Sequence, residues 1–172
     1  GGDIVRHLKA TGKKLFLDLK LHDIPNTAAK GLGALTRLGA DMLNVHASGG
    51  LEMMRRAGEV VAEEAARSGK AAPIVLAVTV LTSIGGDEWA RLGHGEPVQQ
   101  AVLRLAKLTK EAGLQGVVAS PQEAAAIRLA CGKDFAIVTP GIRPAGVSVD
   151  DQQRVATPAS ALAAGASHLA IG

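Results

Sequence analysis

A short polar cluster interrupts an apolar run near the start of the chain, in the sequence FLDLKLHDIPNT at 16–27. Asp18 and Lys20 are two positions apart, so on a β-strand their side chains point to the same side. Asp23 follows beyond the run, in a turn that Pro25 helps to set. A lysine ammonium held beside carboxylates can act as a proton donor. The cluster predicts an acid–base site, although a lone Asp-x-Lys is more often an ion pair at a strand end.

The elements that must position this cluster are predicted by six short apolar runs. Most of these runs are apolar at consecutive positions, which is typical of strands covered on both faces. They occupy residues 15–19, 42–46, 74–80, 116–119, 135–138 and 168–171.

Helical periodicity separates the runs. Apolar residues recur at spacings of three and four after the second and third runs, and 3–11 also predicts a helix. Gly39, Gly69 and Gly113 stand where helix C-terminal caps are expected. Ser120 and Thr157 each precede a proline and predict helix N-caps. The regular strand–helix alternation indicates βαβ units and a parallel sheet.

Polar residues follow nearly every predicted strand, and this distribution favours a barrel over an open sheet. The members are Asp18, Lys20, His46, Ser48, Thr79, Thr82, Ser83, Ser120, Thr139 and Arg143. Such a ring is typical of the active face of a TIM (β/α)8 barrel, and no Gly-x-Gly-x-x-Gly follows the first strand. We therefore predict an α/β fold, an incomplete barrel of about six parallel strands. We expect 1–172 to be a single domain, an internal part of a barrel that lacks roughly two N-terminal strands and one C-terminal helix.

Composition excludes several other classes of protein. The 172 residues are 47% hydrophobic and 2% aromatic, with a net charge of +3 and no dense basic patch, so we expect no nucleic-acid partner. No stretch approaches the ~20 apolar residues of a membrane span. The single cysteine, Cys131, excludes an internal disulfide and a cysteine-based zinc site. The five histidines lack a paired spacing, so we expect no metal site.

The string Asp-Leu-Lys-Leu-His-Asp-Ile-Pro-Asn-Thr resembles the signature of the orotidine 5′-phosphate decarboxylase family. Further segments resemble the family in the same order, over essentially the whole chain: NVHASGG at 44–50, AVTVLTS at 77–83, GVVAS at 116–120, VTPGIRP at 138–144, DQQRVATP at 151–158 and AIG at 170–172. The Asp-x-Lys-x-x-Asp element alone is shared with related sugar-phosphate enzymes, whereas His-Asp-Ile-Pro-Asn-Thr is more specific.

The resemblance implies a cytoplasmic enzyme that converts orotidine 5′-phosphate (OMP) to UMP in pyrimidine biosynthesis, without metal or cofactor. It implies that Lys20 protonates the carbanion left at C6 of the pyrimidine when CO2 leaves. Asp18 would lie beside the substrate carboxylate and hold Lys20 in place. Asp23 and Thr27 match positions that reach the ribose hydroxyls in the neighbouring subunit's site, which implies a homodimer with shared active sites.

The resemblance also implies the remaining substrate contacts. Thr82 matches a pyrimidine contact, with Ser83 beside it. Arg143 and Gln152 match the residues that bind the phosphate, on a loop that we expect to close over the substrate as a lid. Ile24 and Gly172 are also expected among the substrate-binding residues. In the family, a phosphate-binding Arg follows directly after the position of Gly172.

Three further charged residues of the family pattern, an Asp, a second Lys and that Arg, fall outside 1–172, so we expect the isolated chain to be nearly inactive.

Two alternatives stay open. One is a Mg²⁺-dependent sugar-phosphate decarboxylase or aldolase of the same barrel group, which metal dependence would reveal. The other is a non-catalytic fragment that binds a phosphorylated nucleotide.

Overall fold

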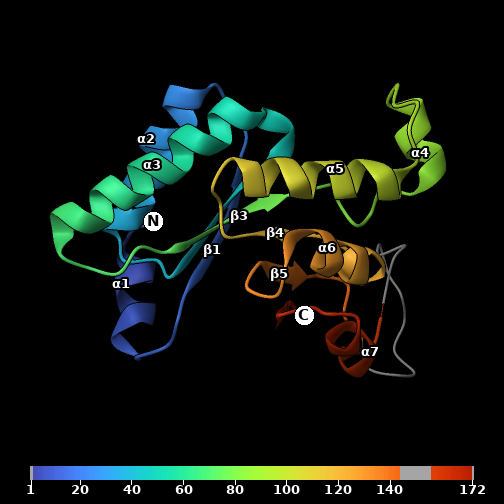
Figure 1. Cartoon of the computed structure of the whole chain (residues 1–172). Helices are drawn as coiled ribbons and strands as arrows, with labels where there is room; N and C mark the ends of the chain where they lie inside the picture. Colours follow the sequence, from blue (N-terminus) through green and yellow to red (C-terminus); the bar gives the residue numbers. More distant parts are fainter. Residues whose placement is uncertain (1, 144–155, 172) are drawn as a thin grey trace.

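The structure is a computed structural model that describes residues 2–143 and 156–171 (Figure 1). Within these residues the strands are β1 (Phe16–Leu21), β2 (Met42–His46), β3 (Ile74–Val78), β4 (Gly116–Val118), β5 (Ala136–Thr139) and β6 (His168–Leu169). The helices are α1 (Gly2–Ala10), α2 (Pro25–Arg37), α3 (Leu51–Ser68), α4 (Gly86–Arg91), α5 (Val98–Glu111), α6 (Ala124–Cys131) and α7 (Pro158–Ala163), with short 3-10 turns η1 (Ala47–Gly49) and η2 (Pro121–Glu123).

The described strands form one parallel sheet in the order β1-β2-β3-β4-β5-β6, so each strand pairs with the next along the chain. The sheet curls, and helices such as α3, α5 and α6 lie along its outer side (Figure 1). A parallel pair needs a crossover, and the intervening helices supply it. This arrangement confirms the predicted fold class, an incomplete (β/α)8 barrel of six parallel strands.

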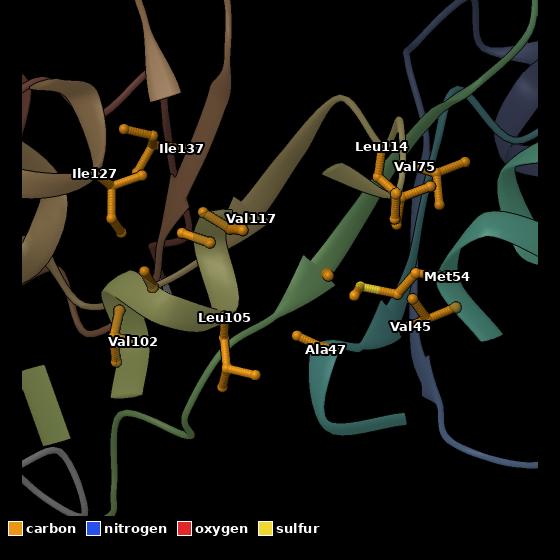
Figure 2. Packing of buried hydrophobic residues seen from close by; sticks show 14 of the residues in the cluster. Val45, Ala47, Met54, Val75, Val102, Leu105, Leu114, Val117, Ile127 and Ile137 are labelled. Carbon is orange, nitrogen blue, oxygen red and sulfur yellow. The ribbon is translucent and has the colours of Figure 1, made fainter. Parts of the chain in front are cut away.

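The outer face of the sheet holds the main core, in which residues at alternate strand positions meet the helices. Ile127 of α6 lies over Ile137 of β5, and Met54 of α3 lies over Val45 of β2 (Figure 2). All four side chains are fully buried. Packing of one apolar helix stripe against a sheet is what stabilises short strands of this kind.

The inner face of the sheet is lined by the other alternate positions. Met42, Leu76 and Val138 form a separate buried cluster there, against which Phe16 and Val118 pack. The strands approach closely at Gly116, where a Cβ would collide with the carbonyl oxygen of Ala136. Because side chains alternate between faces, Asp18 shares the inner side with Phe16.

The helix boundaries confirm the predicted caps. Gly39, Gly69 and Gly113 all adopt positive φ angles, as a left-handed C-terminal cap requires. The Thr157 hydroxyl accepts a hydrogen bond from the Ser160 amide at the start of α7, and Ser120 does the same for Gln122 at η2.

The predicted strand limits are off by one residue at the fourth and fifth strands, and three other strands need larger corrections. The first strand runs to Leu21, not Leu19, and it is not covered on both faces, since Leu19 is 57% exposed. The reason is that β1 lies at one end of the described sheet order. The third strand ends at Val78, two residues early, and the sixth ends at Leu169. None of the described helices is both long and apolar enough to cross a membrane.

Candidate active site

A cavity of about 220 Å³ opens at the carboxyl ends of the strands, between β1, β3, β4 and β5. Its floor is apolar and includes Val78, Val118 and Val138. Its polar wall contains Asp18, Lys20, Thr82 and Ser83. Small-molecule sites commonly measure ~300–1,000 Å³, so a flat ring fits here and a whole nucleotide would extend beyond the cavity.

Asp18 and Lys20 form an ion pair at the mouth of this cavity. The Lys20 Nζ lies 2.8 Å from the Asp18 Oδ1, and both side chains remain partly exposed. The same Oδ1 accepts a hydrogen bond of 2.6 Å from the Asn44 Nδ2. A carboxylate with two donors on one oxygen is fixed in orientation, and it holds the ammonium toward the cavity.

Lys20 reaches the cavity through an irregularity in β1. Its φ of 50° is left-handed, the only positive φ of a non-glycine residue in the described chain. The pairing register shifts here, because Leu17 pairs with Leu43 whereas Leu21 pairs with Val45. A bulge of this kind re-aims a side chain, and bulges are frequent beside active sites. The sequence predicts correctly that Lys20 points to the same side as Asp18. That prediction assumes regular strand alternation, whereas in the structure the irregularity in β1 turns Lys20 toward the cavity.

His46 stands at the end of β2, half-buried behind this pair. Burial is the main cause that lowers its pKa, and electrostatic interactions with His22 and Lys20 act in the same direction, against the effect of Asp18. The two imidazole rings lie 5.3 Å apart, centre to centre. A lowered pKa favours the neutral form of the His46 ring, which disfavours a second cation beside Lys20.

Thr82 and Ser83 follow β3 and both line the cavity, as expected for contacts to a planar ring. Thr82 is buried, with 7% of its surface exposed, whereas Ser83 is exposed. Both residues line the same cavity as the ion pair, so one ligand could contact both walls.

Asp23, Ile24 and Thr27 lie outside the cavity of their own chain. Asp23 is exposed, and its Oδ1 accepts a hydrogen bond from the Ile24 amide at 2.7 Å. Ile24 precedes α2 and is 68% exposed. Thr27 is exposed in the first turn of α2. The structure therefore does not bring these three residues together with Lys20 within one chain.

Arg143 is partly buried, and its Nη1 donates to the carbonyl oxygen of Ile142 at 3.0 Å. It is not among the residues that line the cavity. Gln152 and Gly172, the other expected contacts of the phosphate side, lie outside the described residues. Across the described part of the chain, no three His, Cys, Asp or Glu side chains are grouped so as to hold a metal ion.

Asn44 is not among the residues that the sequence predicts for this site. It is 1% exposed, and it joins the Asp18 carboxylate to the Lys20 backbone. The available signal was a polar residue inside the strand MLNVH, between the apolar residues Leu43 and Val45. A polar residue in such a strand needs a partner, and here the partners belong to the site.

Comparisons with known proteins agree along the whole chain. The family model of the orotidine 5′-phosphate decarboxylase / HUMPS family matches residues 1–172. The orotidine 5′-phosphate decarboxylase of Moorella thermoacetica is 54% identical over 100% of this chain and 69% of its own length. That of Syntrophotalea carbinolica is 51% identical over 100% of this chain and 70% of its own.

Solved structures give the same result. An uncharacterized conserved protein from Geobacillus kaustophilus superposes with a TM-score of 0.86 at 41% identity, covering 100% of this chain and 73% of that one. Orotidine 5′-phosphate decarboxylase from Lactobacillus acidophilus superposes with a TM-score of 0.85 at 40% identity, covering 98% and 70%. With sequence, fold and site order in agreement, the chain belongs to the orotidine 5′-phosphate decarboxylase / HUMPS family.

Proposed function

We propose that this chain carries the catalytic lysine of an orotidine 5′-phosphate decarboxylase, a cytoplasmic enzyme of pyrimidine biosynthesis. The observation that carries the proposal is the Lys20–Asp18 pair, 2.8 Å apart at the mouth of a cavity with an apolar floor. Relatives that are about half identical over the whole chain bear that enzyme's name.

The chemistry follows from the position of the ammonium. The bond between C6 and the carboxylate carbon breaks, the electron pair stays on C6, and CO2 leaves. Lys20 then gives its proton to C6, and solvent returns a proton to Lys20, so OMP and one proton yield UMP and CO2. The apolar floor of the cavity suits a neutral product such as CO2. The Asp18 carboxylate stabilises the ammonium before proton transfer, and its own charge faces the substrate carboxylate.

We further propose that 1–172 is a single domain, an internal part of the decarboxylase barrel, that works as a homodimer. Asp23 and Thr27 are exposed and lie away from the cavity of their own chain. They stand next to Ile24, an isoleucine with 68% of its surface exposed, which a partner subunit would cover. The motif residues would thereby serve the partner's site.

The second candidate is a Mg²⁺-dependent sugar-phosphate enzyme, because the matching family model spans both groups. The Asn-Thr after Pro25 and the names of the curated relatives favour the decarboxylase of OMP. The third reading, nucleotide binding without catalysis, applies to the isolated chain if catalysis requires the three charged residues of the family pattern that fall outside 1–172.

The test compares two proteins and two substrate classes. One protein is this chain, and the other is this chain extended at both ends with the flanking segments of the M. thermoacetica relative. Loss of OMP is followed by ultraviolet absorbance with EDTA present, and hexulose 6-phosphates are offered with Mg²⁺. Turnover of OMP by the extended protein in EDTA is expected, with little or none by the short chain. Turnover of sugar phosphates alone would overturn the proposal, and UMP binding without turnover would favour the third reading.

A further inference from the structure

Asn44 contacts both halves of the Lys20–Asp18 pair from the neighbouring strand. Its Nδ2 donates to the Asp18 Oδ1 at 2.6 Å, and its Oδ1 accepts from the Lys20 backbone amide at 2.8 Å. The side chain is buried, whereas Asp18 and Lys20 remain partly exposed. A buried amide is costly unless its polar atoms are bonded, and here both ends of the amide are used.

The orientation of the Asn44 amide is fixed by its partners. A carboxylate can only accept a hydrogen bond, and a backbone N–H can only donate one. The reversed amide would place oxygen against carboxylate and NH2 against N–H, so it would lose both bonds. Asn44 therefore supplies both the donor that Asp18 needs and the acceptor that the Lys20 amide needs. Of two side chains of similar size, an ionised aspartate would lack the donor and a leucine would lack both.

The backbone of Lys20 needs such support. A left-handed conformation is unfavourable for a residue with a side chain, and it persists only where the surroundings fix it. The Asn44 Oδ1 bonds the amide of this very residue, inside the register shift between Leu17 and Leu21. The same side chain thus holds the bulge and orients the carboxylate.

We propose that Asn44 is a positioning residue, whose amide holds Lys20 in its left-handed conformation and fixes the Asp18 carboxylate, so that the lysine ammonium faces the cavity. The catalytic meaning of this role rests on the proposed function. The geometric role does not, because it concerns two hydrogen bonds within the chain.

The first test measures these bonds without any substrate. In ¹⁵N-labelled chain, the hydrogen exchange of the Lys20 amide is compared between wild type and Asn44→Leu. The matched control is Gln115→Leu, since the Gln115 Oε1 accepts from the Val75 amide at 2.8 Å at the other end of the sheet. We expect Asn44→Leu to speed exchange of the Lys20 amide at least about tenfold and to spare Val75, and Gln115→Leu to do the reverse. Equal acceleration of both amides in Asn44→Leu would reduce Asn44 to a general packing residue and overturn the proposal.

The second test uses Asn44→Asp, which keeps size and an acceptor for the Lys20 amide but sets a second carboxyl group against Asp18. Two carboxyl groups this close raise the pKa of the pair, so the pair holds a shared proton toward pH 5 and loses it toward pH 8. While protonated, the new carboxyl can donate to Asp18 as the amide does, and once both groups are ionised they repel each other. In the extended protein we expect kcat for OMP to fall about 100-fold at pH 8 and to recover toward pH 5, with KM little changed. Gln115→Glu is the charge-matched control.

A ratio of variant to wild-type kcat that stays constant from pH 5 to 8 would contradict the positioning role, as would an unchanged kcat. If wild-type protein does not turn over OMP, the proposed function fails, and amide exchange still decides the role of Asn44. If Asn44→Leu does not fold, the exchange comparison is made on Asn44→Ala, which also removes the acceptor of the Lys20 amide. Faster exchange of that amide is expected there, and an unchanged rate would overturn the proposal.

Discussion

At the scale of single residues, the site depends on an exception to strand geometry. Lys20 combines an ammonium, an ion pair with Asp18 and a left-handed backbone in one position. Most residues with a side chain avoid this backbone region, and glycine does not. A lysine stands here in a conformation that glycine would adopt more easily, so its ion pair with Asp18 and the hydrogen bond from its amide to Asn44 must offset the conformational cost.

The conformational cost at Lys20 can be measured by comparing Lys20→Gly with Lys20→Ala. Both variants remove the ammonium, so their difference reports on the backbone alone. Because Cβ disfavours a φ of 50°, we expect Lys20→Gly to be more stable by about 1 kcal/mol in urea unfolding. At the control position Lys30, inside α2, the order should reverse by a similar amount. An alanine variant at Lys20 as stable as the glycine variant would contradict the left-handed conformation.

At the scale of elements, Asp41 ties α1 to the start of the sheet. Its carboxylate accepts from the Lys9 Nζ at 2.6 Å and from the Leu15 amide at 2.7 Å. The hydrogen bond from Lys9 is the main cause that lowers the pKa of Asp41, and the Leu15 amide adds to it against the effect of burial. The loop between α1 and β1 is thereby fixed at the amino end of β2, opposite the site.

Replacing Asp41 should give a pH-dependent loss of stability. The pKa of Asp41 is lower in the folded chain than its ordinary value of 3.8, so its contribution is present above that value and disappears as pH falls below it. We expect Asp41→Asn to lower the free energy of unfolding by about 1 kcal/mol or less at pH 7, because the pair is one-third exposed, and by a smaller amount at pH 3. Urea titrations at both pH values measure this, with Asp134→Asn as control. An equal loss at both pH values would exclude the ionic contribution.

The elements themselves were largely predictable from local pattern, and the geometry of the site was not. The second strand, 42–46, and the helix that contains Val98 and Leu105 follow directly from apolar periodicity. The end of β1 does not, because its register shift and the conformation of Lys20 depend on Asn44, which lies on another strand. Such contacts between distant segments leave no periodic signal in the sequence.

At the scale of the whole molecule, the described sheet curls around a cavity whose polar groups come from β1 and from the segment after β3. Asp23 and Thr27, by contrast, are exposed outside that cavity. This division is the reason for proposing paired sites across a two-fold axis, where each subunit gives Lys20 to its own site and Asp23 to its partner's.

Complementation tests this division of roles. In the extended protein, Lys20→Ala and Asp23→Ala should each abolish most OMP turnover alone. Unfolding an equal mixture and refolding it forms mixed dimers, in which one site carries both substitutions and the other carries neither. We expect recovery of about a quarter of wild-type activity. No recovery, in a mixture shown by mass spectrometry to contain mixed dimers, would place Asp23 in the same site as Lys20 or outside both.

The most direct test of the central claim is the rate of OMP decarboxylation by the extended protein and by its Lys20→Ala variant, measured with EDTA present. The control is Lys133→Ala, which removes an exposed lysine from the turn before β5. We predict that Lys20→Ala lowers kcat by about 1,000-fold or more while Lys133→Ala leaves it unchanged, because general-acid catalysis contributes ~10²–10⁴-fold. If the kcat of the Lys20→Ala variant is within a factor of about ten of the wild-type kcat, the assignment of Lys20 as the proton donor is contradicted.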